Sequence, residues 1–84
     1  MYRYMICDTP NEEIFYKQCD ALEKNIKEID KKDLLEDVDG SKIQVYYYNN
    51  KNIKVINSYY ENELFVESEI ELEKFFKNPM KVSE

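Results

Sequence analysis

The chain has 84 residues, a formal net charge of −6 at pH 7, and no histidine or tryptophan. This length predicts one small globular domain over residues 1–84, which buries only about 60–65% of the surface that the unfolded chain exposes. Such a core is too small to enclose a deep substrate pocket as well. The acidic charge argues against direct binding to nucleic acid or to an anionic membrane, because both require a basic surface.

The cysteine content and the hydropathy indicate a cytoplasmic protein. Cys7 and Cys19 are too few for the disulfide framework of a small secreted domain. The first seven residues are too short and too aromatic to resemble a signal peptide, and no stretch approaches the roughly 20 apolar residues that cross a bilayer. We therefore expect reduced thiols and a cytoplasmic location.

The first third of the chain predicts a strand followed by a helix. Residues 1–7 alternate in a pattern that is typical of a strand. Thr9, Pro10 and Glu12 then have the spacing of a helix N-cap, a first helical residue and a capping-box glutamate. A stripe of apolar residues follows at helical spacing: Phe15, Cys19, Leu22, Ile26 and Ile29. The sequence therefore predicts one helix over residues 11–31.

The middle of the chain predicts two hairpins. Asp39-Gly40 contains the only glycine and marks a turn that needs a positive φ. Residues 49–52 and 61–62 predict two more turns, on either side of a strand over 53–60.

A further strand is predicted between the Asp39-Gly40 turn and residue 49, and the faces of both strands follow from their alternation. Ile43, Val45 and Tyr47 are expected to face the core, so that Tyr46 and Tyr48 lie on the opposite face of the sheet. The next strand is expected to turn four residues to the core side: Ile53, Val55, Asn57 and Tyr59.

Between residues 61 and 73 every odd position except 65 is a glutamate. If the segment is extended, these carboxylates lie on one face at steps of about 6.6–6.8 Å. Successive phosphates on a nucleic-acid strand are roughly 6–7 Å apart. The spacing therefore raises the hypothesis that the acids mimic phosphates.

The end of this acidic segment has two interpretations. In the first, a strand over 63–67 is followed by a helix over 69–77, because Ser68 and Glu71 have capping-box spacing and Pro79 ends the run. In the second, the strand continues to residue 73. The helix would shorten the row of carboxylates to residues 61–67.

The sequence lacks the side chains on which most catalytic and metal sites depend. Without histidine there is neither the commonest general base nor the commonest transition-metal ligand, and one glycine cannot form a glycine-rich phosphate loop. Asp37, Asp39 and Gly40 are wrongly spaced for an EF-hand calcium loop. We expect neither an enzyme nor a cofactor or metal site.

Together the elements predict an α+β fold in the order β-α-β-β-β-(β)-α. An opening strand and a three- or four-stranded meander would form a small antiparallel sheet, with two helices packed on one face.

For function, the sequence favours a non-catalytic acidic protein that inhibits or neutralises a cationic partner, such as a nuclease or another nucleic-acid-binding effector. Acids would supply complementarity and fast association, and aromatic residues would supply apolar anchors. In size and charge the chain is similar to small acidic phage proteins that block restriction or CRISPR effectors. The expected partner-binding residues are Glu61, Glu63, Glu67, Glu69, Glu71, Glu73, Tyr59, Tyr60, Phe65, Tyr46, Tyr48, Glu36, Asp37 and Asp39.

Two other interpretations stay open. An immunity protein against a basic nuclease toxin would use the same acidic surface. A homodimeric assembly or adaptor module would instead use an exposed, tyrosine-rich sheet face. Salt distinguishes them, because charge attraction is screened whereas apolar burial is not.

Overall fold

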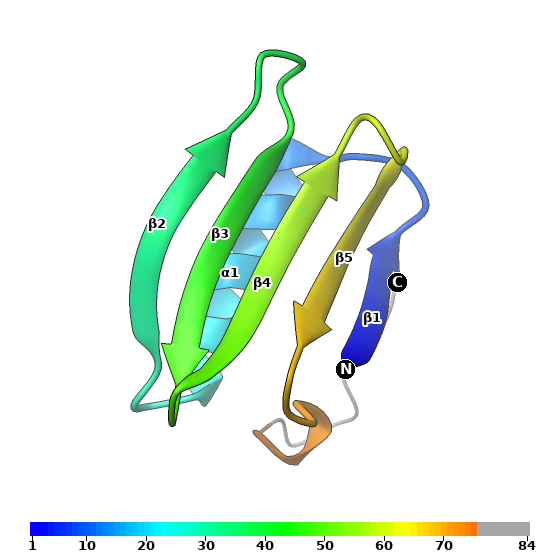
Figure 1. Cartoon of the computed structure of the whole chain (residues 1–84). Helices are drawn as coiled ribbons and strands as arrows, with labels where there is room; N and C mark the ends of the chain where they lie inside the picture. Colours follow the sequence, from blue (N-terminus) through cyan, green and yellow to red (C-terminus); the bar gives the residue numbers. More distant parts are fainter. Residues whose placement is uncertain (76–84) are drawn as a thin grey trace.

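In the part of the chain that the structure describes, five antiparallel strands form one sheet in the order β1-β5-β4-β3-β2, and a single α-helix covers one face of it (Figure 1). This computed structural model describes residues 1–75. In chain order the elements are β1 (Tyr2–Cys7), α1 (Glu12–Asn25), β2 (Asp30–Glu36), β3 (Lys42–Tyr48), β4 (Lys51–Ser58), β5 (Glu63–Ser68) and a 3-10 turn, η1 (Glu73–Phe75). We call the sheet face away from α1, on which Ile43, Ile56 and Phe65 lie, the open face.

The helix α1 begins at an asparagine cap. Asn11 has an extended backbone, and its Oδ1 accepts a hydrogen bond from Ile14 N at 3.0 Å. The N-cap is therefore Asn11, and the prediction of Thr9 was wrong by two positions. Asn11 N also donates to Oδ1 of the buried Asn57 on β4 at 2.9 Å. This bond fixes the start of the helix against the sheet.

The core lies between α1 and the sheet. The predicted helical stripe is confirmed, since Phe15, Cys19 and Leu22 are buried and Ile26 is buried at the helix end. The remaining core residues come from the sheet and from the segment after it: Ile6, Tyr46, Ile53, Val55, Leu64, Val66 and Leu72. The predicted core face of β4 is confirmed as far as Asn57, whereas Tyr59 is half-exposed in the following turn.

β3 faces the opposite way from the prediction. Gln44 and Tyr46 are buried beneath α1, whereas Ile43 and Val45 lie on the open face and Tyr47 is exposed there. The aliphatic residues were expected to occupy the core side, and that expectation was wrong.

Hydrogen bonding explains why tyrosines take the core side of β3. The Tyr46 hydroxyl donates to Glu23 Oε2 at 2.6 Å, so the ring is buried without leaving a polar atom unpaired. Tyr48, on the same face, packs edge-on against Phe75 with ring centroids 5.2 Å apart. Tyr46 and Tyr48 therefore stabilise the core and do not form an exposed aromatic face.

The helix ends at Asn25 rather than near residue 31, because the following residues form a strand that the sequence did not reveal. Asn25 Nδ2 donates to Ala21 O at 2.7 Å, and Ile26 already has an extended backbone with φ −117°. Residues 30–36 then pair with β3 as the edge strand β2. This pairing satisfies backbone groups of β3 that would otherwise lie at the sheet edge.

The segment after β5 is neither a helix over 69–77 nor a strand to residue 73. β5 ends at Ser68, whose Oγ accepts from Ile70 N at 3.0 Å and donates to Ile70 O at 2.6 Å. This local bonding bends the chain away from the sheet. A 3-10 turn over 73–75 follows, and residues 76 and 77 of the predicted helix lie outside the described residues. The α+β class is confirmed, with one α-helix on the sheet in residues 1–75.

Candidate functional site

Two turns lie side by side at one end of the sheet, at the top of Figure 1. One connects β2 to β3 and the other connects β4 to β5. Tyr59 N, in the second turn, donates to Ser41 Oγ in the first at 2.9 Å. The Tyr59 ring lies against Gly40, where a Cβ atom would be only 3.3 Å from Tyr59 Cε2. Gly40 also has φ +92°, so both the backbone and the close approach favour glycine.

The acids of the β2–β3 turn are held by local hydrogen bonds. Asp37 Oδ1 accepts from Val38 N at 2.7 Å, and Asp39 Oδ1 accepts from Ser41 N at 2.9 Å. The bonds that Asp39 accepts from Ser41 lower the pKa of its carboxyl group below the ordinary value of 3.8. Asp39 is therefore a fixed negative charge at neutral pH.

The two turns gather acids from distant parts of the sequence. Residues 36–41 and 59–63, which we call the acidic turn end, contain no lysine or arginine. Their acids are Glu36, Asp37, Asp39, Glu61 and Glu63. The first turn of α1 adds Glu12 and Glu13 at the same end of the sheet.

Two basic side chains approach this end and are already paired. Lys42 has a side chain only 14% exposed, with Nζ 3.2 Å from Glu12 Oε2 and 3.5 Å from Glu36 Oε2. These contacts, mainly the one with Glu12, raise the pKa of Lys42 above its usual value. Arg3 Nη2 lies 2.8 Å from Glu63 Oε1 and 3.8 Å from Glu61 Oε1. Within residues 1–75, neither Asp37 nor Asp39 forms an ion pair.

Exposed apolar side chains lie among the charged residues of the acidic turn end. Tyr60 is 91% exposed at the tip of the β4–β5 turn, and Val38 is fully exposed at the tip of the β2–β3 turn. The arrangement offers two apolar side chains within an acidic field.

No family model, curated protein or solved structure matches this chain. The function must therefore be inferred from the geometry. Among residues 1–75 no group of histidine, cysteine or acidic side chains could hold a metal ion. In that same part of the chain, no helix has the length and hydropathy to cross a membrane.

The predicted site residues fall into four places. Half of them meet at the acidic turn end: Glu36, Asp37, Asp39, Tyr59, Tyr60, Glu61 and Glu63. Phe65 and Glu67 lie on the open face, and Tyr46 and Tyr48 lie on the core side. Glu69, Glu71 and Glu73 follow the other end of β5.

The six glutamates therefore do not form one row of carboxylates. β5 ends at Ser68, and Glu69 Oε1 is occupied by a hydrogen bond from Asn52 N at 2.9 Å. Glu61, Glu63 and Glu67 instead surround the guanidinium of Arg3, which lies 3.9 Å above the Phe65 ring. Phe65 is only 3% exposed under this cation and cannot act as an exposed anchor.

The sequence did not reveal an apolar row that crosses the open face. Paired residues on successive strands contribute one side chain each: Met5, Phe65, Ile56, Ile43 and Leu35. The alternation of β1, β3, β4 and β5 was visible, but assigning the wrong face of β3 to the core hid the row. Leu35 belongs to β2, a strand that was not predicted.

Two shallow hollows adjoin this row beside β2. The acidic hollow, of about 210 Å³, is lined by Leu35, Glu36, Asp37, Ser41 and Ile43. The aromatic hollow, of about 290 Å³, is lined by Lys32, Asp33, Leu35, Val45 and Tyr47. Leu35 lines both, and the other lining residues place the acidic hollow nearer the β2–β3 turn than the aromatic hollow.

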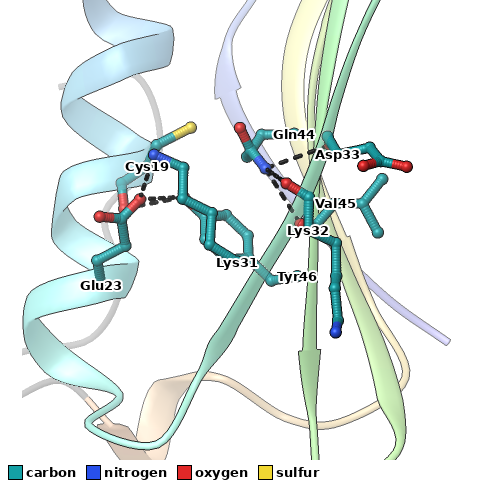
Figure 2. Close-up of polar contacts among 8 residues, drawn as sticks. All are labelled: Cys19, Glu23, Lys31, Lys32, Asp33, Gln44, Val45 and Tyr46. Atoms are coloured by element: carbon teal, nitrogen blue, oxygen red, sulfur yellow. Dashed lines mark hydrogen bonds and ion pairs between the residues drawn. The ribbon is translucent and has the colours of Figure 1, made fainter.

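Polar contacts, most of them only partly buried, hold β2 in place beside these hollows (Figure 2). At the bulge where the register of β2 shifts, Gln44 Nε2 donates to Lys32 O at 2.9 Å and to Asp33 O at 3.2 Å. Lys31 Nζ lies 3.3 Å from Oε2 of Glu23, which also accepts the Tyr46 hydroxyl. Both the sheet and α1 therefore fix the strand that carries the hollows.

Proposed function

We propose that this chain is a non-catalytic cytoplasmic protein that uses the acidic turn end to neutralise a cationic, nucleic-acid-binding surface of another protein. The observation that carries the proposal is the joining of the two turns through Tyr59, Gly40 and Ser41. This contact gathers five acids and an exposed tyrosine into one surface.

The physical basis is complementarity around an apolar anchor. Carboxylates that face a basic patch accelerate association and orient the partner, while a central aromatic side chain supplies area that excludes water. Tyr60 meets the second requirement because it projects from the turn, and its ring loses little rotamer freedom on binding.

The class of partner follows from the charge. Proteins that bind nucleic acid present clustered lysine and arginine, which an acidic surface competes for. A phage inhibitor of a restriction or CRISPR effector and an immunity protein against a nuclease toxin use this same chemistry. The proposed function includes both the phage inhibitor and the immunity protein.

A second candidate is a homodimeric or adaptor module that buries the open face. The apolar row from Met5 to Leu35 supports it, because every member except Phe65, which Arg3 covers, is at least partly exposed and is suited to packing against another apolar surface. The strength of such an association depends on the apolar area that it buries rather than on charge.

The experiment that tests the proposal is capture of partners by the tagged chain at about 0.1 M and about 0.5 M salt, over which the screening length falls from roughly 10 Å to 4–5 Å. We expect a basic nuclease or nucleic-acid-binding protein whose capture weakens with salt and is competed by DNA. Tyr60→Ser should reduce the capture, and Tyr2→Ser, at the other end of the sheet, should not. Capture only of a second copy, unchanged by salt, would favour the dimeric module instead.

A further inference from the structure

We propose that the two hollows beside β2 bind an extended segment of the cationic partner, with a lysine or arginine side chain in the acidic hollow and a large apolar side chain in the aromatic hollow. This inference rests on the proposed function. It specifies which kind of partner segment binds beside β2 when the acidic turn end binds a basic surface.

The separation of the hollows sets the spacing of the two side chains. The acidic hollow is lined by Ser41, the residue just before β3, and by Ile43 on β3, whereas the aromatic hollow is lined by Val45 and Tyr47 on β3. Corresponding residues are four positions apart, which is about 13 Å along a strand. Positions i and i+4 of an extended segment lie on one face at the same distance.

The acidic hollow suits a long cationic side chain. Asp37 provides a carboxylate without an ion-pair partner in residues 1–75, whereas the neighbouring Glu36 is shared with Lys42. Leu35 and Ile43 provide an apolar floor along which the methylene stem of lysine or arginine can pack. The turn that contains Asp39 lies directly beyond, so the field at the hollow is negative.

The aromatic hollow suits an uncharged side chain. Lys32 and Asp33 have opposite charges, and Lys32 Nζ lies 5.6 Å from the centre of the Tyr47 ring. The other lining residues, Leu35, Val45 and Tyr47, are apolar or aromatic. Its volume of about 290 Å³ falls at the lower limit of small-molecule sites, which hold roughly 300–1,000 Å³, and fits a single large side chain.

The hollows are formed before a partner arrives. Gln44 fixes the bulge of β2 through the carbonyl groups of Lys32 and Asp33, two of the residues that line the aromatic hollow. A preformed wall reduces the ordering cost of binding.

The experiment is a titration of the full chain, labelled with ¹⁵N, with extended peptides of about nine residues, followed by amide chemical shifts. The first probe carries arginine and phenylalanine at positions i and i+4 among serine and threonine, in either order. The control probes replace arginine by glutamate, replace phenylalanine by serine, or place the two residues at i and i+2. We expect saturable shifts at Ile43, Val45 and Tyr47 with the first probe only.

Two neighbouring leucines provide a matched pair of variants. Leu35 is 51% exposed and lines both hollows, whereas Leu34 is 41% exposed and pairs with Gln44 on the other face of β2. Leu35→Lys should lower the affinity for the arginine–phenylalanine peptide about tenfold or more. Leu34→Lys should change its affinity by less than about twofold. Amide spectra of the free variants establish that both are folded.

Three results would overturn the proposal: no saturable shift at millimolar peptide, equal affinity for the glutamate–phenylalanine probe, or equal loss in the two leucine variants. Shifts restricted to the amides of residues 30–36 would indicate strand addition at the edge of β2 instead. The proposed function fails separately, when capture of a basic partner does not depend on salt or on Tyr60.

Discussion

At the residue scale, the hydroxyl of Tyr46 determines which face of β3 is buried. It donates to Glu23 Oε2 at 2.6 Å and lies 3.4 Å from Cys19 O. A tyrosine can occupy the core here because α1 places an acceptor within hydrogen-bonding distance of its hydroxyl group. No pattern in the sequence links residue 46 to residue 23.

Replacing Tyr46 by phenylalanine should therefore be costly. We expect Tyr46→Phe to lower the free energy of unfolding by about 1–2 kcal/mol, because the buried Tyr46 side chain loses a hydrogen bond to a carboxylate acceptor. Urea denaturation measures this change. Tyr47→Phe, on the open face of the same strand, is the control and should stay within about 0.5 kcal/mol of the original chain. Equal losses would contradict the role of the Tyr46 hydroxyl.

Cys19 should make the protein less stable in alkaline solution. Burial is the largest cause that raises the pKa of its thiol from 9.0 to about 11, so the folded chain holds this proton where the unfolded chain releases it. The stabilising effect is complete below pH 9 and is lost as the pH rises toward about 11.

The measurement is urea denaturation at a series of pH values. Across that window we expect the free energy of unfolding to fall by roughly 2–3 kcal/mol more in the original chain than in Cys19→Ala. Burial also raises the pKa of Tyr46, which adds to the alkaline loss in both chains. Identical pH profiles would show that the Cys19 thiol does not contribute.

At the scale of elements, the sequence predicted what depends on neighbours along the chain and missed what depends on distant partners. β1, the stripe on α1, the Asp39-Gly40 turn and the β3–β4 turn follow from local periodicity and turn chemistry. Asn49 and Asn50 confirm the last of these with φ values of 51° and 63°. The acidic turn end was predicted only in part, because the sequence indicated its two turns but not the contact between them.

β2 shows why the rest was missed. Its sequence, Asp-Lys-Lys-Asp-Leu-Leu-Glu, has no alternation, and all of its residues are exposed. The strand forms because β3 offers it a backbone partner and because Gln44 bridges the bulge. A buried glutamine in place of an aliphatic residue indicates such a bridge only after the pairing is known.

Removing the Gln44 amide should loosen β2 selectively. We expect Gln44→Ala to destabilise the chain by about 1 kcal/mol, because water can replace only part of the bonding at the edge. Amide hydrogen exchange should accelerate at residues 30–36 and stay unchanged in the β1–β5 pair. Gln18→Ala, on α1, is the control. Uniform acceleration over the whole sheet would contradict a local role for Gln44.

At the scale of the whole molecule, charge is divided between the two ends of the sheet. The acidic turn end contains five acids without a lysine or arginine, whereas Glu69, Glu71 and Glu73 lie beyond the other end, with Lys74 next to them. A partner guided only by net charge would not distinguish these ends. A partner that binds the surface organised by Tyr59 and Gly40 would.

The most direct test of the proposed function compares two triple variants in binding to the captured basic partner. Asp37→Asn/Asp39→Asn/Glu61→Gln alters the acidic turn end, and Glu69→Gln/Glu71→Gln/Glu73→Gln alters the opposite end. Each removes three negative charges and changes the net charge from −6 to −3. Each replacement keeps an oxygen that can accept the local hydrogen bonds.

Association rates and affinities would be measured at about 0.1 M salt, where exposed charges act over roughly 10 Å. The proposed function predicts that the turn-end variant binds about tenfold or more weakly, mainly through slower association, while the other variant stays within about twofold. Equal weakening would mean that net charge alone drives binding. A larger loss in the variant at residues 69–73 would contradict the placement of the site at the acidic turn end.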